Sequence, residues 1–121
     1  MSPRILVVED EPDIAAIVVD YLRHAGYTVE YQAEGRAALA SIVAAPPDLT
    51  LLDIMLPDSD GLDICKGIRN DAQFAQIPII FLTARASETD RIVGLELGAN
   101  DYIVKPFFVR EVIARIKLQF R

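Results

Sequence analysis

The feature that most constrains the fold is a regular alternation between short apolar runs and segments with helical periodicity. The five apolar runs are Arg4–Val8, Tyr27–Gln32, Asp48–Asp53, Ile77–Thr83 and Asp101–Lys105. Four of them are almost continuously apolar, as expected of parallel strands that are covered on both faces. The run Tyr27–Gln32 instead alternates polar and apolar residues, which indicates an edge strand. Because parallel neighbours need crossover connections, the intervening segments should be helices.

The segments between the runs have the spacing of amphipathic helices. Apolar residues form one stripe on the first of them, which ends near Gly26: Ile14, Ile17, Val18, Tyr21 and Leu22. The later helical segments are Ala38–Val43, Gly61–Arg69, a segment that Ser87 opens with a capping pattern, and Val109–Phe120. We therefore predict an α/β fold, a doubly wound (βα)5 sheet with right-handed crossovers and the strand order 2-1-3-4-5.

Composition excludes several classes of protein. A chain of 121 residues has room for one domain and one core. The formal net charge of -6 argues against direct binding to nucleic acid or to an anionic membrane. The apolar runs are too short for a membrane span or a signal peptide. The single cysteine, Cys65, allows no internal disulfide, so we expect an acidic, cytoplasmic, single-domain protein.

Chemically reactive side chains stand at the carboxyl ends of four predicted strands. The first strand ends in Glu9-Asp10, the third in Asp53, the fourth in Thr83 and the fifth in Lys105. Taken alone, each could be an ordinary solvated loop residue. In this strand order, however, they converge on one rim, where sheets of this type bind ligands. Uncompensated carboxylates would raise one another's pKa, and a divalent cation with hard oxygen ligands, such as Mg²⁺, removes that conflict.

Four segments carry a resemblance to a known family, and they occur in the order VVEDEP, LLDIMLPDSDG, PIIFLTA and DYIVKPF. Together they resemble the receiver domain of two-component response regulators, across residues 1–121 and most closely the OmpR/PhoB-type class. The resemblance implies a flavodoxin-like fold. It also implies a phosphorylation-activated switch that accepts a phosphoryl group from a sensor histidine kinase. Such a domain catalyses its own phosphorylation and dephosphorylation, and it is not an enzyme acting on other substrates.

The same resemblance assigns the phosphoacceptor and the metal ligands. Asp53 would attack phosphorus and become an acyl phosphate. Asp10, Asp53 and the backbone carbonyl of Met55 would bind Mg²⁺, for which Mn²⁺ could substitute. Glu9 would support the metal directly or through water. Glu11 has no role in the motif, and we assign it to the solvated start of the first helix. The side chain of Met55 would also tune dephosphorylation.

Further roles follow for residues of the last two strands. Lys105 would pair with the phosphoacceptor at rest and with the phosphoryl oxygens afterwards, and its peptide bond to Pro106 would be cis. Thr83 would hydrogen-bond a phosphoryl oxygen, and Tyr102 would turn inward into the space that Thr83 vacates. Arg85 would share the tuning of dephosphorylation. These assignments describe a bistable element that phosphorylation biases.

A predicted interaction face lies on the last two helices and the strand between them. Val93 and Leu97 can face the core, which leaves neighbouring apolar residues outward among charges. Proteins of the resembled class dimerise symmetrically through such a face. The predicted dimer face comprises Arg91, Ile92, Leu95, Glu96, Asp101, Glu111, Ile113 and Arg115. Asn100 replaces a common acidic residue, which would weaken one ion pair, and Phe108 is either a core residue or a contact.

Four alternatives compete with a phosphorylation switch that controls transcription. An aspartyl-phosphate phosphatase would need an aspartate where Met55 stands. A flavin carrier would need a glycine-rich phosphate loop in place of EDEPD, and a degenerate receiver would not retain the full set of reactive residues. A stand-alone phosphorelay receiver that acts through protein contacts remains open. We expect that residues 1–121 are excised from a longer chain with a C-terminal DNA-binding domain, since nothing in this segment reads DNA.

Overall fold

The computed structural model describes residues 2–121 as helices alternating with strands. The strands are β1 (Arg4–Val8), β2 (Thr28–Gln32), β3 (Leu49–Leu52), β4 (Ile79–Thr83) and β5 (Asp101–Val104). The helices are α1 (Pro12–His24), α2 (Gly35–Ala44), α3 (Gly61–Asn70), α4 (Glu88–Glu96) and α5 (Val109–Gln119). The strands form one sheet in the order β2-β1-β3-β4-β5, and every neighbouring pair is parallel. The predicted doubly wound (βα)5 fold is therefore confirmed, with β2 at an edge.

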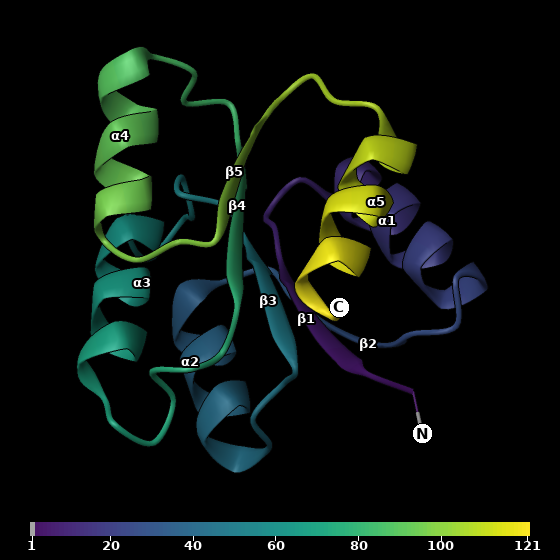
Figure 1. Ribbon diagram of the computed structural model, residues 1–121, viewed down its shortest axis with the longest axis horizontal. Coiled ribbons are helices and arrows are strands. Elements are labelled where there is room, and N and C mark those ends of the chain that lie inside the picture. The colour runs from purple at the N-terminus through teal and green to yellow at the C-terminus, as the bar shows by residue number, and fades with distance from the viewer. Residues whose placement is uncertain (1) are drawn as a thin grey trace.

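Helices cover both faces of the sheet and create two separate hydrophobic cores. Helices α2, α3 and α4 lie on one side, and α1 and α5 lie on the other (Figure 1). The first core joins residues such as Ile42, Ile64 and Phe81, and the second joins Leu22, Ile80 and Ile116. The central strands β1, β3 and β4 are buried along almost their whole length, which explains their nearly continuous apolar sequence. None of the helices in residues 2–121 is both long and apolar enough to cross a membrane.

The helices bury narrower faces than the apolar stripes in the sequence suggest. In α1, Val18 and Leu22 are buried, but Ile17 and Tyr21 remain exposed at the margin of the stripe. In α4 the prediction for Val93 was wrong, because this side chain is 37% exposed. Within α4, all of which the structure describes, Gly94 is the one buried residue. At Gly94 the helix comes close to the Tyr102 ring on β5. This close approach determines which side of α4 faces the sheet.

Arg69, near the end of α3, bonds to the segments that precede β4 and β5. Its guanidinium donates hydrogen bonds to the backbone carbonyls of Gly98, Ala75 and Ile77 over 2.8, 3.1 and 2.7 Å. It also donates to Asn100 Oδ1 over 2.9 Å, and the same oxygen accepts from the amide of Ile79. Asn100 thus has a specific hydrogen-bonding role. Its side chain ties the connection between α4 and β5 to Arg69 and to the first residue of β4.

Candidate functional site

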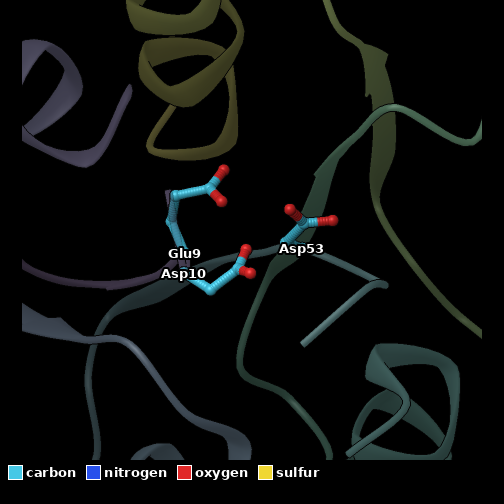
Figure 2. Close-up of side chains that lie close together, drawn as sticks. All are labelled: Glu9, Asp10 and Asp53. Carbon is cyan, nitrogen blue, oxygen red and sulfur yellow. The ribbon is translucent and has the colours of Figure 1, made fainter. Parts of the chain in front are cut away.

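The reactive side chains predicted at the strand ends do come together at one end of the sheet. Glu9 and Asp10 directly follow β1, Asp53 directly follows β3, and Thr83 is the last residue of β4. Since β1, β3 and β4 are neighbours, their carboxyl ends share one rim. Carboxylate oxygens of Glu9, Asp10 and Asp53 all lie within 4.8 Å of one another. Figure 2 shows these three carboxylates arranged around a common space.

Two of the three carboxylates are buried, which makes the cluster electrostatically costly. Glu9 is 2% exposed and Asp53 is 3% exposed, whereas Asp10 is exposed to solvent. Burial raises the pKa of Glu9 to about 7, and the nearby charge of Asp53 adds to this rise, although hydrogen bonds from Lys105 and from the Glu11 amide oppose it. The folded protein therefore holds a carboxyl group whose ionisation depends strongly on the cations around it.

Lys105 supplies the positive charge that this cluster needs. Its ammonium nitrogen Nζ lies 2.8 Å from Asp53 Oδ2 and 2.6 Å from Glu9 Oε1. Burial by itself would lower the pKa of Lys105, but the bonds to Asp53, Glu9 and Glu11 raise it above its ordinary value. The peptide bond between Lys105 and Pro106 is cis, the conformation that the resemblance implied.

The assignment of Glu11 to solvent was incomplete. Its carboxylate is exposed, and the residue does form the N-cap position of α1, as predicted. Yet Glu11 Oε2 accepts a hydrogen bond from Lys105 Nζ over 2.9 Å. Sequence gave no hint of this contact, because the two residues are 94 positions apart.

The donor set fits a hard divalent cation. Glu9 Oε1 is buried, and its partner among residues 2–121 is the Lys105 ammonium at 2.6 Å. Buried carboxylates are costly unless cations compensate them, and here one ammonium serves both Glu9 and Asp53. Asp10 is exposed and leaves the cluster open to solvent on its side. Such carboxylates together with water are the ligands that Mg²⁺ prefers.

The loop after β3 is tied down around Asp53. The amide of Met55 donates to Asp53 Oδ1 over 3.1 Å. A side chain on Gly61 would lie 2.2 Å from the backbone oxygen of Asp53, so the close approach of α3 requires glycine at that position. Farther along the loop, Asp58 accepts hydrogen bonds from the first two amides of α2, including that of Gly35 over 2.7 Å. No pattern in the sequence indicates this anchor, because Asp58 and α2 are remote in sequence.

Thr83 and Tyr102 lie on the neighbouring strands β4 and β5, and both bond to the backbone of Arg85. Thr83 is fully buried, and its Oγ1 accepts from the amide of Arg85 over 3.3 Å. Tyr102 is 4% exposed, and its hydroxyl donates to the carbonyl oxygen of Arg85 over 2.6 Å. The tyrosine ring packs against Phe81, with ring centroids 5.8 Å apart. In this structure the ring is therefore turned inward while Lys105 is paired with the carboxylates.

The predicted dimer face presents apolar side chains and internal ion pairs. Ile92 and Leu95 are exposed on α4, at 46% and 47%. Arg115 forms ion pairs with Asp101 and Glu111 within the same chain, each over 2.9 Å. Ile113 on α5 is half-buried and packs against the core that α1 and α5 cover. Arg91, Glu96 and Phe108 are exposed. Of the two alternatives for Phe108, the core position is thus excluded.

Comparison with known proteins identifies the family. The profile described as "Response regulator receiver domain" matches residues 5–117. The chain belongs to the response regulator receiver family. Over 120 residues it is 49% identical to the transcriptional regulatory protein BaeR of Escherichia coli. The aligned region covers 99% of this chain and 49% of BaeR. The chain thus spans about half the length of this curated relative, which is an OmpR/PhoB-type regulator.

Solved receiver structures have the same fold as this domain. The BeF3-activated N-terminal receiver domain of RstA from Klebsiella pneumoniae is 37% identical, with a TM-score of 0.90 and 98% of both chains covered. The chemotaxis response regulator CheY4 of Vibrio cholerae is 31% identical, with a TM-score of 0.91 over 98% of this chain and 99% of that chain. The protein is accordingly a receiver of a two-component system, with the acidic site at which receivers bind Mg²⁺. Membership also implies an interaction with a histidine kinase.

Proposed function

We propose that Asp53 accepts a phosphoryl group from a sensor histidine kinase in a Mg²⁺-dependent reaction. A carboxylate oxygen of Asp53 attacks phosphorus, the bond to the histidine nitrogen breaks, and an acyl phosphate forms on the aspartate. The observation that carries this proposal is the surroundings of Asp53. Its buried carboxylate is paired with the ammonium of Lys105 and has oxygens of Glu9 and Asp10 within 4.8 Å.

The remaining roles follow from charge and position around this carboxylate. Glu9, Asp10, Asp53 and the backbone carbonyl of Met55 would hold Mg²⁺ or Mn²⁺, which supplies positive charge for the transferring group when bound. Lys105 would move one of its hydrogen bonds from Asp53 to a phosphoryl oxygen, and Thr83 would donate its hydroxyl to another. Most of the rate acceleration in phosphoryl transfer comes from such positioning and charge stabilisation. The side chains of Met55 and Arg85 would limit the access of water and so tune dephosphorylation.

Incubation with acetyl phosphate and Mg²⁺ tests the proposal directly. We expect the wild-type protein to gain the mass of one phosphoryl group, and the gain to disappear when EDTA removes the metal. Asp53→Asn should gain nothing, whereas the control Asp63→Asn, which alters an exposed aspartate on α3, should react like wild type. A wild-type protein that stays unmodified where a known receiver reacts would refute the assignment of Asp53.

The output side of the proposal concerns the face formed by α4, β5 and α5. Phosphorylation would draw Thr83 towards the phosphoryl group and favour the inward position that Tyr102 already has. Through these two residues it would alter the face that carries Ile92 and Leu95 and promote a symmetric dimer. Exposed apolar residues beside ion-paired charges support this proposal. The similarity to BaeR supports control of transcription through a DNA-binding domain outside residues 1–121, in the cytoplasm.

Sedimentation of the protein with and without beryllofluoride tests the dimer. We expect a shift from monomer to dimer with the analogue, and no shift for Leu95→Asp, because a carboxylate on each partner would have to be buried in the interface. Ile17→Asp on the exposed side of α1 is the control and should dimerise normally. A monomer under both conditions would refute the dimer while leaving phosphorylation untouched.

A further inference from the structure

Lys105 has three carboxylate partners in this structure. Besides Asp53 and Glu9, the ammonium donates to Glu11 Oε2 over 2.9 Å. A lysine ammonium has three N–H donors. Three carboxylates therefore surround Lys105, whose side chain is 10% exposed, and the side chain of Glu11 is the most exposed partner at 57%.

The side chain of Glu11 serves this contact and no helix cap. Glu11 stands at the N-cap position of α1, but its carboxylate makes no capping hydrogen bond within residues 2–121. Its backbone is held in place, because its amide donates to Glu9 Oε2 over 3.1 Å. The fold thus fixes the backbone of Glu11 at the rim and directs its carboxylate to the lysine of the site.

We propose that Glu11 is a positioning residue that holds Lys105 in its resting place and competes with the phosphoryl group for the ammonium. This inference rests on the proposed function of Asp53. When Asp53 carries the phosphoryl group, Lys105 must turn at least one donor towards the new oxygens. Glu9 and Asp53 are both candidate metal ligands, so Glu11 is the partner of Lys105 whose carboxylate stays free to compete. Its negative charge also opposes the approach of an anionic phosphodonor.

The first test uses the metal-free protein and needs no phosphorylation. The sequence has three lysines, Lys66, Lys105 and Lys117, of which Lys66 and Lys117 are exposed. In a protein labelled with nitrogen-15 lysine, the ammonium protons of Lys105 should exchange slowly with water, since the group is nearly buried and ion-paired. We expect the exchange to become at least about threefold faster in Glu11→Gln, because loss of the charge weakens one of the three contacts.

The second test measures the rate of phosphorylation by acetyl phosphate at saturating Mg²⁺. We expect Glu11→Gln to react faster than wild type, by about threefold to tenfold, as removal of one nearby, half-screened negative charge implies. The matched control is Asp13→Asn, which removes the same charge two residues away on an exposed side chain. This control should react at the wild-type rate and leave the exchange of Lys105 unchanged.

Several outcomes would overturn the proposal. Unchanged ammonium exchange in Glu11→Gln would show that Glu11 does not hold Lys105. A rate equal to or below that of wild type would show that Glu11 does not compete for the ammonium, and an equal gain in Asp13→Asn would assign the effect to net charge. If the wild type itself takes no phosphoryl group, the proposed function fails, and the exchange measurement still decides whether Glu11 holds the lysine.

Discussion

Replacing Gly94 with alanine tests how α4 packs on Tyr102. A Cβ at this position would lie 2.9 Å from both Cδ2 and Cε2 of Tyr102 and 3.3 Å from Cδ2 of Phe81. Carbon atoms pack best at about 3.5–4.0 Å, so the added methyl group overlaps the inward-facing ring. Either α4 shifts away from the sheet, or Tyr102 leaves the position in which its hydroxyl bonds the Arg85 carbonyl.

The expected loss of stability can be worked out from two opposing effects. Alanine is a better helix former than glycine by about 1 kcal/mol. Overpacking costs about 1–3 kcal/mol, and expulsion of the ring instead would lose a hydrogen bond of about 1 kcal/mol together with buried apolar area. We therefore expect Gly94→Ala to reduce the free energy of unfolding by about 1 kcal/mol, because the steric cost exceeds the gain in helix propensity.

Gly67 on α3 provides a matched control in the same protein. A Cβ at Gly67 would meet no heavy atom of the described residues within 4 Å. Gly67→Ala should therefore stabilise the protein by up to about 1 kcal/mol, through helix propensity alone. Urea unfolding followed by circular dichroism measures both variants, since the chain contains no tryptophan to report by fluorescence.

A double-mutant cycle identifies the contact that is responsible. In a Tyr102→Ala background the clash with the ring is removed, and Gly94→Ala should become neutral or stabilising. The reasoning is refuted if Gly94→Ala stabilises wild type as much as Gly67→Ala does. It is equally refuted if the penalty persists unchanged in the Tyr102→Ala background.

Two further predictions concern charge and hydrogen bonding. Because burial raises the pKa of Glu9 to about 7, the folded protein binds this proton more tightly than the unfolded chain, whose value is near 4.5. The corresponding stability is fully present below pH 4.5 and is lost as the pH rises through 7. Denaturant unfolding of the metal-free protein should show this slope, and Glu9→Gln should remove it; an unchanged slope would contradict the prediction. Arg69→Met should lower the free energy of unfolding by about 2–4 kcal/mol, because it leaves several partly buried carbonyls without donors. Thermal unfolding measures this loss, with the exposed Arg36→Met as control, and an equal effect of both would contradict it.

The position of the site illustrates which tertiary features a sequence can predict. Glu9, Asp53 and Thr83 each stand at the end of an apolar run, and parallel strands bring their carboxyl ends to one rim. Their convergence thus follows from a rule of topology and needs no knowledge of side-chain packing. The same rule indicated Lys105, which directly follows β5.

The limits of sequence patterns are clearest in the helices. An apolar stripe predicts that a helix packs against something, but it does not fix how far the helix is rotated. Val93 has the apolar character of a core residue, yet the approach of α4 at Gly94 leaves it exposed. The rotation of α4 depends on the size of the Tyr102 ring beneath it, which belongs to another part of the chain.

The sequence by itself determined the five-stranded parallel sheet, the edge position of β2, and the acidic rim with its lysine. These features depend on local periodicity and on the position of residues relative to strand ends, both of which are visible along the chain. Only the tertiary structure decided that Glu11 contacts Lys105, that Asp58 anchors the loop after β3 to α2, and that Gly94 makes room for Tyr102. Each of these contacts joins segments that are remote in sequence. Their formation depends on side-chain length, rotamer and packing distance, which no periodicity in the sequence encodes.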